Sequence, residues 1–474
     1  MTVFFRYYLL LTGIILGLVA CSPFTPREIS GAAGSLPETY ALYNGSPDMS
    51  TPWWESVGSA ELNRLIRDAL AENFTLKEAW ARLQQSRALA VQAGADRFPY
   101  LEGFAATDLS QRRIPSAGVD GSETYALGLF TSYEIDLWGR IRSQREAALE
   151  TMAATGADFQ TARMTIAAEV ADRWVQLLSR RLQIQLLERQ LENNLIFLDL
   201  IELRFRKAMV SALDVYQQKQ VVENVRARIP LVEAQRQLLH HELAVLLGRP
   251  PRSQLKLSQT ALPVIGLLPA VGLPADLLAN RPDVRAAGMR LTASQWQVAA
   301  ARANRLPSLQ LTAGAQYGAS AMDALFDTWL LNLAADLTAP MFDGGRRAAE
   351  VDRTRAQVDE NLWIYRQAVL TAIKEVEDAL ESETRQREHI EGLDAVMMAA
   401  RKGLEEAIQR YRRGLSDYLP VLTQLIAVQD LERDLIEQQE TLIRYRIALY
   451  RSLGGAWIEG GIRSTEPDQS KKRG

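Results

Sequence analysis

Two long proline-free stretches constrain the fold of this chain more than any other feature of its sequence. No proline occurs between Pro115 and Pro230, or between Pro340 and Pro420. Proline is the residue that a helix interior excludes most strongly, so each stretch can form continuous helix. Residues 140–206 would span roughly 100 Å as one helix, at ~1.5 Å per residue. A compact domain has no room for a helix of that length.

Apolar residues in this stretch recur every seven positions, which is typical of helices that pack along a shared seam. The repeating positions are Val170, Leu177, Ile184, Leu191, Leu198 and Phe205, and the same spacing returns near the other end of the chain at Leu435, Leu442 and Leu449. The sequence therefore predicts long helices packed against one another.

The chain also contains an internal duplication. At an offset of 208 residues, Leu70, Ala71, Arg82, Leu83, Arg97, Pro99 and Leu101 match Leu278, Ala279, Arg290, Leu291, Arg305, Pro307 and Leu309. At an offset of 206, Gly139-Arg140 matches Gly345-Arg346, and residues 204–207 match residues 410–413. We expect two tandem copies of a helix, hairpin, long helix and helix unit, at residues 58–275 and 276–458, before a flexible tail at 459–474.

Four short segments alternate between apolar and polar residues, and every apolar set has odd numbers. The apolar residues are Leu101, Ala105, Leu109, Tyr125, Leu127, Leu129, Tyr133, Ile135, Leu309, Leu311, Ala313, Tyr317, Trp329, Leu331, Leu333, Ala335 and Leu337. Strands about ten residues long with one apolar face form membrane β-barrels. A soluble antiparallel sheet that covers a core alternates in the same way. The expected loops, Gln111 to Glu123 and Gly318 to Asp327, favour the barrel.

Four strands cannot close a barrel. An open sheet edge in hydrocarbon leaves backbone groups unsatisfied, at several kcal/mol each. If the strands form a membrane barrel, several copies of the chain must therefore contribute to it. A barrel wider than about eight strands leaves a water-filled interior.

The N-terminus predicts export and a lipid anchor. Arg6 precedes the apolar stretch 7–20, which is too short for a confident membrane span and is typical of a signal peptide at residues 1–20. The run Leu18-Val19-Ala20-Cys21 resembles a bacterial lipobox, and Cys21 is the only cysteine. We expect a covalent lipid on Cys21, followed by a linker at 21–57, and Ser22 resembles an outer-membrane sorting address. The alternative is an ordinary signal peptide with an incidental cysteine.

Composition argues against several classes of function. The 54 basic and 57 acidic residues are interleaved along the chain, which does not suggest nucleic-acid binding. The three histidines, His240, His241 and His389, lack zinc-site spacing and have no nucleophile motif nearby. We therefore expect no enzyme activity and no cofactor besides the lipid on Cys21.

Four motifs identify a family. They are Tyr133 to Arg140 (YEIDLWGR), Arg281 to Arg285 (RPDVR), Ala339 to Arg346 (APMFDGGR) and Tyr411 to Leu422. In this order, on a duplicated scaffold behind a lipobox, they resemble the outer membrane factors, or TolC-like channels. The similarity is greatest to the NodT-type lipoprotein branch, which serves resistance-nodulation-division efflux pumps.

This resemblance implies a mostly α fold with a membrane β-barrel. It implies a homotrimer whose twelve-stranded barrel continues into a twelve-helix tunnel, embedded in outer-membrane lipid and anchored by lipid. The expected location is the outer membrane of a Gram-negative bacterium, with an extension into the periplasm. The implied function is a passive duct that exports small molecules such as drugs, together with a periplasmic adaptor protein and an inner-membrane resistance-nodulation-division transporter.

Two kinds of alternative stay open at this point. A periplasmic adaptor lipoprotein also carries a lipobox and a coiled-coil hairpin, although it needs one hairpin flanked by lipoyl-like and barrel strands, whereas two helical copies occur here. The same channel fold also serves metal efflux and type I protein secretion.

The two helix turns, Ala208 to Val215 and Gly414 to Val421, are the candidate periplasmic gate, which we expect to rest closed. Gly414 can end a helix, and Ser211, Asp214, Ser416 and Asp417 can cap the returning helices. In a threefold ring the two aspartates would favour cations and pair with Arg206, Arg412 or Arg413 on neighbouring helices. Tyr418 and Leu419 would add an apolar constriction. Family relatives often carry carboxylates where this chain has Pro420 and Thr423, so its closing network must differ.

Overall fold

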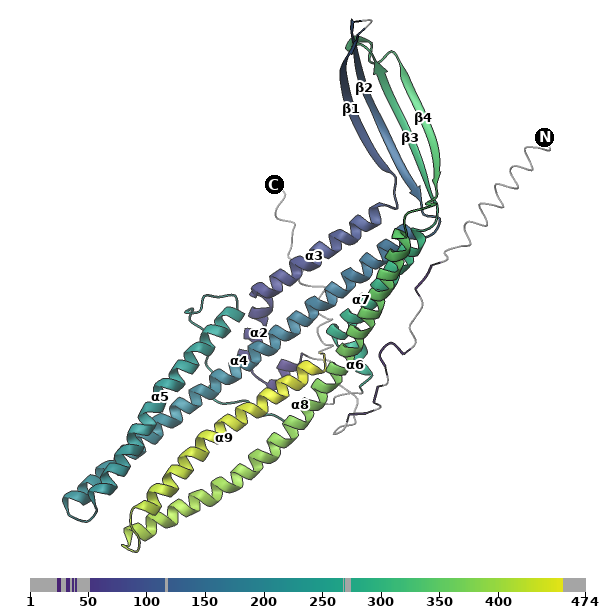
Figure 1. The fold of residues 1–474 in the computed structure, drawn as a ribbon. Coiled ribbons are helices and arrows are strands. Elements are labelled where there is room, and N and C mark those ends of the chain that lie inside the picture. The colour runs from purple at the N-terminus through teal and green to yellow at the C-terminus, as the bar shows by residue number, and fades with distance from the viewer. Residues whose placement is uncertain are drawn as a thin grey trace. The chain divides into compact units, whose positions relative to one another are not determined.

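The computed structural model describes residues 24–26, 31–34, 36–37, 39–40, 52–115, 118–266, 268 and 274–454. Cys21, the signal peptide and the predicted tail at 459–474 lie outside these residues. The described chain is mostly helical and contains one four-stranded sheet (Figure 1). It forms two compact units. We call them the sheet unit, with Ala81–Ala157 and Ala286–Gln367, and the hairpin unit, with Ser35–Trp80, Asp158–Arg285 and Ala368 onward.

The order of elements confirms the predicted duplication. The first copy contains α2 (Ala60–Glu72), α3 (Phe74–Ala95), β1 (Tyr100–Ile114), β2 (Gly118–Ile135), α4 (Arg140–Arg206) and α5 (Ala212–Leu246), after a short 3-10 helix η1 (Trp53–Val57). The second contains α6 (Asp276–Asn280), α7 (Pro282–Ala303), β3 (Ser308–Ala319), η2 (Met322–Ala324), β4 (Trp329–Thr338), α8 (Arg346–Arg412) and α9 (Leu419–Ser452). The long helices α4 and α8 have 67 residues each. The bounds predicted for α4 are confirmed.

The four strands form an antiparallel sheet in the order β1-β2-β3-β4. The first hairpin is longer than predicted, because pairing continues to Ile114 opposite Gly118. Most of the expected loop from Gln111 to Glu123 is therefore strand, and β3 likewise runs to Ala319. These added residues are mostly polar, and their backbone groups pair across the hairpin without any apolar alternation to mark them.

Two of the family motifs form the joints between the sheet and the long helices within the sheet unit. The carboxylate of Asp136 accepts hydrogen bonds from the backbone N–H groups of Ile141 and Arg142, at 3.1 and 2.7 Å. Asp343 accepts from the N–H groups of Gly345 and Arg347, at 3.0 and 3.2 Å. Each aspartate satisfies N–H groups that the first turn of a helix leaves unpaired, and its negative charge suits that end of the helix dipole.

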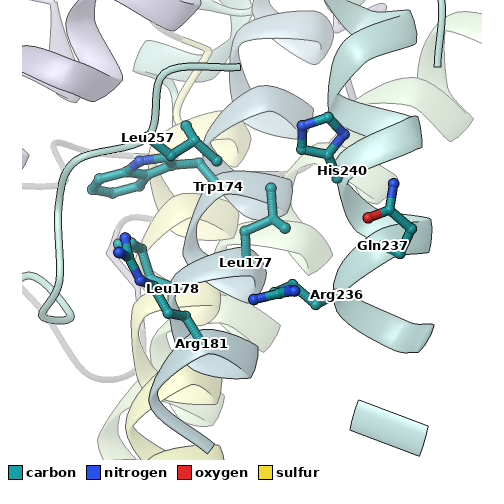
Figure 2. A pocket seen from close by; sticks show the side chains of 8 residues that line it. All are labelled: Trp174, Leu177, Leu178, Arg181, Arg236, Gln237, His240 and Leu257. Carbon is teal, nitrogen blue, oxygen red and sulfur yellow. The ribbon is translucent and has the colours of Figure 1, made fainter. Parts of the chain in front are cut away.

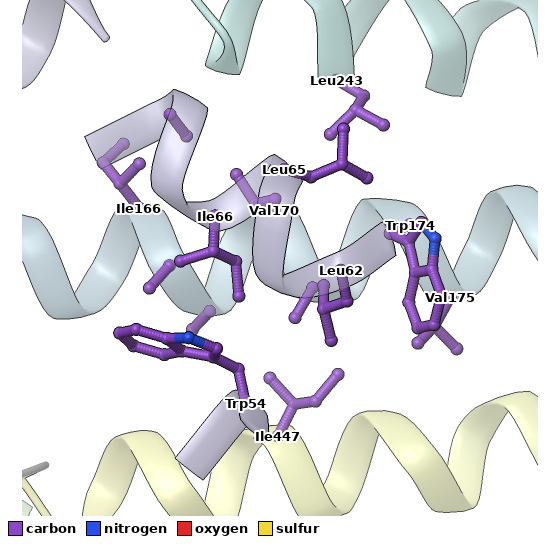
Figure 3. Close-up of a cluster of buried hydrophobic side chains, with 14 of the residues drawn as sticks. Trp54, Leu62, Leu65, Ile66, Ile166, Val170, Trp174, Val175, Leu243 and Ile447 are labelled. Carbon is purple, nitrogen blue, oxygen red and sulfur yellow. The ribbon is translucent and has the colours of Figure 1, made fainter. Parts of the chain in front are cut away.

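The hairpin unit is held together by a core in which α2 lies between α4, α5 and α9 (Figure 3). Val170 and Leu177 of α4 are buried there, as the seven-residue spacing predicted, and Trp174 between them is buried as well. Farther along the same stripe, Phe205 is exposed, so the seam is buried over only part of the helix. Burying one large apolar side chain contributes roughly 1.5–3 kcal/mol, so this cluster is a main source of the unit's stability.

A buried carboxylate anchors the loop after α5 to this core. Glu61 accepts hydrogen bonds from the Trp174 indole at 2.8 Å, from the Ser258 hydroxyl at 2.9 Å and from the Gln259 backbone N–H at 3.1 Å. Burial alone would raise the pKa of Glu61, but these hydrogen bonds outweigh it and hold the pKa below its ordinary value. The loop is thereby fixed against α2 and α4.

None of the described helices combines the length and the apolar character needed to cross a membrane.

Candidate functional site

The first helix turn is built from two local motifs. At the end of helix α4, the backbone N–H of Met209 donates to the carbonyl of Arg204 at 2.9 Å. The backbone N–H of Ala208 donates to the carbonyl of Phe205 at 2.8 Å. This Schellman arrangement requires a left-handed residue, and Ala208 fills that place with φ of 55°. Helix α5 then begins with Ser211, whose backbone N–H donates to Asp214 at 2.8 Å while Asp214 N–H donates to the Ser211 hydroxyl at 3.3 Å.

The second turn ends its helix in the same way but starts the next one differently. Gly414 takes the left-handed place with φ of 71°, and Leu415 N–H bonds to the Arg410 carbonyl at 2.9 Å. Helix α9 then has Tyr418 as its N-cap residue, without a side-chain cap, so the caps predicted from Ser416 and Asp417 are wrong. A capping side chain belongs to the N-cap residue, and Asp417 and Ser416 lie one and two positions before Tyr418.

Tyr418 is buried, with 2% of its surface exposed, and it connects the two helical hairpins. Its hydroxyl donates to the side-chain carbonyl of Gln218 at 2.8 Å, and the Gln218 amide donates to the backbone carbonyl of Asn194 at 2.8 Å. Burial raises the pKa of Tyr418, and Tyr411 and Asp214 add to the effect. The prediction that Tyr418 lines an apolar constriction does not fit this position, because helices of its own chain enclose the ring. Leu419 beside it is exposed.

A contact of Arg204 with the ring of Tyr411, and of that ring with the ring of Tyr418, which the sequence did not predict, joins the same two turns. The guanidinium of Arg204 lies 4.5 Å from the ring centre of Tyr411, which lies 5.5 Å from that of Tyr418. Around them, α4, α5, α8 and α9 share an apolar cluster that includes Ile201 and Val421. The signal was present in the duplication, since Arg204 corresponds to Arg410 and Phe205 to Tyr411, but only the fold shows that one repeat contacts the other here.

The three candidate arginines, Arg206, Arg412 and Arg413, are exposed, and within the described part of one chain none pairs with Asp214 or Asp417. The carboxylate of Asp214 is already engaged by Ser211. Within the described chain, the candidate arginines and aspartates therefore do not pair with one another.

Both turns also expose apolar side chains at matching positions. Met209 and Leu213 in the first turn correspond to Leu415 and Leu419 in the second, and all four are exposed. Exposed apolar groups that recur in this way are typical of a surface that contacts another protein.

The sheet has one apolar face, and most of its side chains are exposed, apart from local contacts such as that of Tyr317 with Phe326. Odd-numbered residues pair with odd-numbered residues between all neighbouring strands, so they share one face of the sheet. Leu129 and Leu333 on this face are 54% and 74% exposed, and no described strand residue is buried. The alternative of a soluble sheet that covers a core does not fit this exposure. Along their described lengths, β1 and β4 each pair with one neighbour and leave one edge open.

Comparison with known proteins agrees with this architecture. The family model described as "Outer membrane efflux protein" matches residues 65–249 and 273–455, one segment for each repeat. The chain is 34% identical to the pyoverdine export outer membrane protein OpmQ of Pseudomonas putida, over 95% of this chain and 97% of the relative. It is 32% identical to the toluene efflux pump outer membrane protein TtgI of Pseudomonas putida, over 84% of this chain and 85% of the relative.

Among solved structures, the outer-membrane channel OprN superposes with a TM-score of 0.86 at 29% identity, over 92% of this chain and 100% of that channel. The sequence match, the duplicated helices and the uncovered apolar sheet lead to the same conclusion: this chain belongs to the outer membrane efflux protein family and is a subunit of an outer-membrane efflux channel.

Proposed function

We propose that three copies of this chain form a closed duct through which small organic molecules leave the cell. The observation that carries the proposal is the uncovered apolar face of a sheet with two open edges. In hydrocarbon, open edges would cost several kcal/mol for each unsatisfied backbone group, so the strands of neighbouring copies must pair. Twelve strands would then enclose a water-filled barrel that continues into a tunnel of twelve helices.

We propose small organic molecules as cargo, in preference to metal ions or secreted proteins. The support comes from relatives named for pyoverdine export and for toluene efflux, both of which are above 30% identity with this chain. The chain itself would act passively and without catalysis, while an inner-membrane resistance-nodulation-division transporter supplies the energy.

A periplasmic adaptor protein would join the channel to that transporter at the helix turns. The four exposed apolar residues of the turns, Met209, Leu213, Leu415 and Leu419, would supply the contact surface. Substituting them with serine should weaken co-purification of the adaptor, without loss of the trimer from outer-membrane fractions.

The lipid on Cys21 is part of the same proposal. Stable membrane anchoring needs two or more acyl chains or a second membrane contact. Mass spectrometry of the mature N-terminus should show a lipid-modified Cys21, and an unmodified start elsewhere in the chain would exclude the anchor. Because the barrel is itself embedded, Cys21→Ser should impair sorting or assembly more than the final fold.

We also propose that the two turns close the periplasmic end at rest. Asp214 and Asp417, each present three times, would make the opening cation-selective and would pair with Arg206, Arg412 or Arg413 of neighbouring copies. Exposed ion pairs contribute under about 1 kcal/mol each, which suits a closure that an adaptor must release.

The test is single-channel conductance of the purified trimer in planar bilayers. Asp214→Asn removes the charge but keeps an oxygen that can accept the Ser211 hydrogen bond, so it separates gating from helix capping. Combined with Asp417→Asn, it should reduce cation selectivity. Replacing Arg206, Arg412 and Arg413 as well should enlarge the small openings that we expect of the wild type. Arg355→Gln on α8, outside the turns, is the matched control and should change neither property.

Three results would contradict the proposal. They are a protein that migrates as a monomer in unheated outer-membrane samples, a wild-type pore that is already wide open, or turn variants that behave like the control.

A further inference from the structure

The hairpin unit contains a cavity of about 270 Å³ between α4, α5 and the loop that follows α5. Figure 2 shows Trp174, Leu177 and Arg181 projecting from α4, and Arg236, Gln237 and His240 projecting from α5 toward them. Leu178 and Leu257 complete the lining. The buried side chains of Trp174, Leu177 and Leu178 make an apolar floor, and the more exposed polar groups lie around it.

The polar part of the lining is entirely basic or neutral. No carboxylate lines the cavity, and within the described residues Arg181 and Arg236 form no ion pair. One N–H of the Arg181 guanidinium donates a hydrogen bond to the backbone carbonyl of Gln259 at 3.2 Å. Nδ1 of His240 is enclosed and has no hydrogen-bond partner among the described residues.

The carboxylate on the other side of Trp174 does not neutralise this charge. Glu61 accepts from the Trp174 indole and from Ser258 and Gln259, so its oxygens are already engaged. The cavity thus combines an apolar floor with two guanidinium groups that have donors to spare. A cation would be repelled there, and a neutral apolar guest would leave the guanidiniums without an anionic partner.

We propose that this cavity binds a small organic anion, with a carboxylate or similar head on a compact apolar body. Guanidinium groups bind planar carboxylates through paired, charge-assisted hydrogen bonds, while the floor of Trp174 and leucines would cover the apolar part. Pockets that hold drug-sized ligands measure about 300–1,000 Å³, so a guest of this cavity is smaller than those. The proposal rests on these lining residues of a single chain.

Binding of benzoate to the purified full-length protein in lipid nanodiscs tests the proposal, with benzamide as the neutral analogue. Titration calorimetry should show saturable binding of benzoate and at least tenfold weaker binding of benzamide. Arg181→Gln and Arg236→Gln should each weaken benzoate binding about tenfold or more, because each removes charge-assisted hydrogen bonds. Arg189→Gln on α4 and Arg228→Gln on α5, which do not line the cavity, are the matched controls and should bind like the wild type.

A second measurement locates the site without relying on the variants. A benzoate that carries a photoactivated diazirine should label peptides of α4 and α5 that line the cavity, and excess benzoate should suppress the labelling. Equal binding of benzoate and benzamide, equal loss in the lining and control variants, or labels confined to other segments would each overturn the proposal. Because none of these readouts measures conductance, the result is independent of the proposed duct.

Discussion

Ala208 and Gly414 occupy the same place in the two turns, and the difference between them predicts a local difference in stability. Both are left-handed, with φ of 55° and 71°. A residue with a Cβ pays roughly 1–2 kcal/mol there, which glycine avoids. Ala208→Gly should therefore slow amide hydrogen exchange in the first turn, and Gly414→Ala should speed it in the second, where an added Cβ would meet no atom within 4 Å. Equal exchange in variant and wild type at both turns would show that backbone strain does not matter there.

Arg281, the first residue of the RPDVR motif, predicts a pH dependence. It is buried and donates to both oxygens of Asp283 at 3.0 and 2.6 Å, to Glu375 at 2.7 Å and to the carbonyl of Ser452 at 3.1 Å. Burial alone would raise the pKa of Asp283, but the hydrogen bonds and charge of Arg281 outweigh it and lower the pKa below its ordinary value. This pairing stabilises the fold above the unfolded-state pKa of about 3.9 and is lost as pH falls through the lower folded-state pKa.

Asp283→Asn should therefore unfold at a lower temperature than the wild type at pH 7, and the gap should close as the pH falls below about 4. Thermal unfolding of the purified protein at a series of pH values measures this gap. Asp323→Asn, in the short η2 segment, is the control and should show no such gap. If the difference between Asp283→Asn and wild type were as large at pH 3 as at pH 7, the pair would not be its source.

At the scale of elements, the shared parity of the four strands predicts two classes of substitution. Leu129→Arg and Leu333→Arg place a charge on the apolar face and should cost roughly 2–4 kcal/mol near the bilayer midplane. Ser132→Arg and Asn332→Arg place the same charge on the opposite face and should be tolerated. Yield of heat-modifiable oligomer in the outer membrane distinguishes the classes. If both classes gave the same yield, the apolar face would not contact lipid.

The elements differ in how far the sequence predicts them, for physical reasons. Helix α4 was predicted with its observed bounds because residues 140–206 contain no proline and the turn predicted from Ala208 to Val215 follows them. The extension of the first hairpin to Ile114 and Gly118 was missed, since its backbone pairing needs no apolar pattern. The cap expected from Ser416 and Asp417 is absent because α9 begins at Leu419, so Tyr418 takes the N-cap position instead. The basic cavity was missed because its lining comes from three segments that only the fold brings together.

At the scale of the whole molecule, the sheet is the part that a single copy leaves incomplete. Strand β2 pairs with β1 and β3, and β3 pairs with β2 and β4, so their backbone groups are satisfied on both sides. The outer strands β1 and β4 each retain one edge of N–H and C=O groups without a strand partner in the described chain. Pairing of β4 of one copy with β1 of the next would satisfy both edges at once.

Disulfide crosslinking in the outer membrane tests this closure. Single cysteines placed along β1, such as Ala105→Cys, combined with cysteines along β4, such as Ala335→Cys, should form bonds between copies in a Cys21→Ser background wherever the two strands come into register. Facing residues of paired strands have Cβ atoms about 4.5–5.5 Å apart, and a slightly strained disulfide can span that distance. Cysteine pairs that face each other should therefore crosslink, and pairs that do not should not. The products should reach three copies and no more, because a ring closes whereas an open array grows.

Cysteines at Ala126 and Gly314, in strands already paired within the chain, provide the control and should give no bond between copies. A ladder of products beyond three copies would indicate an open array, and crosslinks confined to one copy would indicate that β1 meets β4 of its own chain.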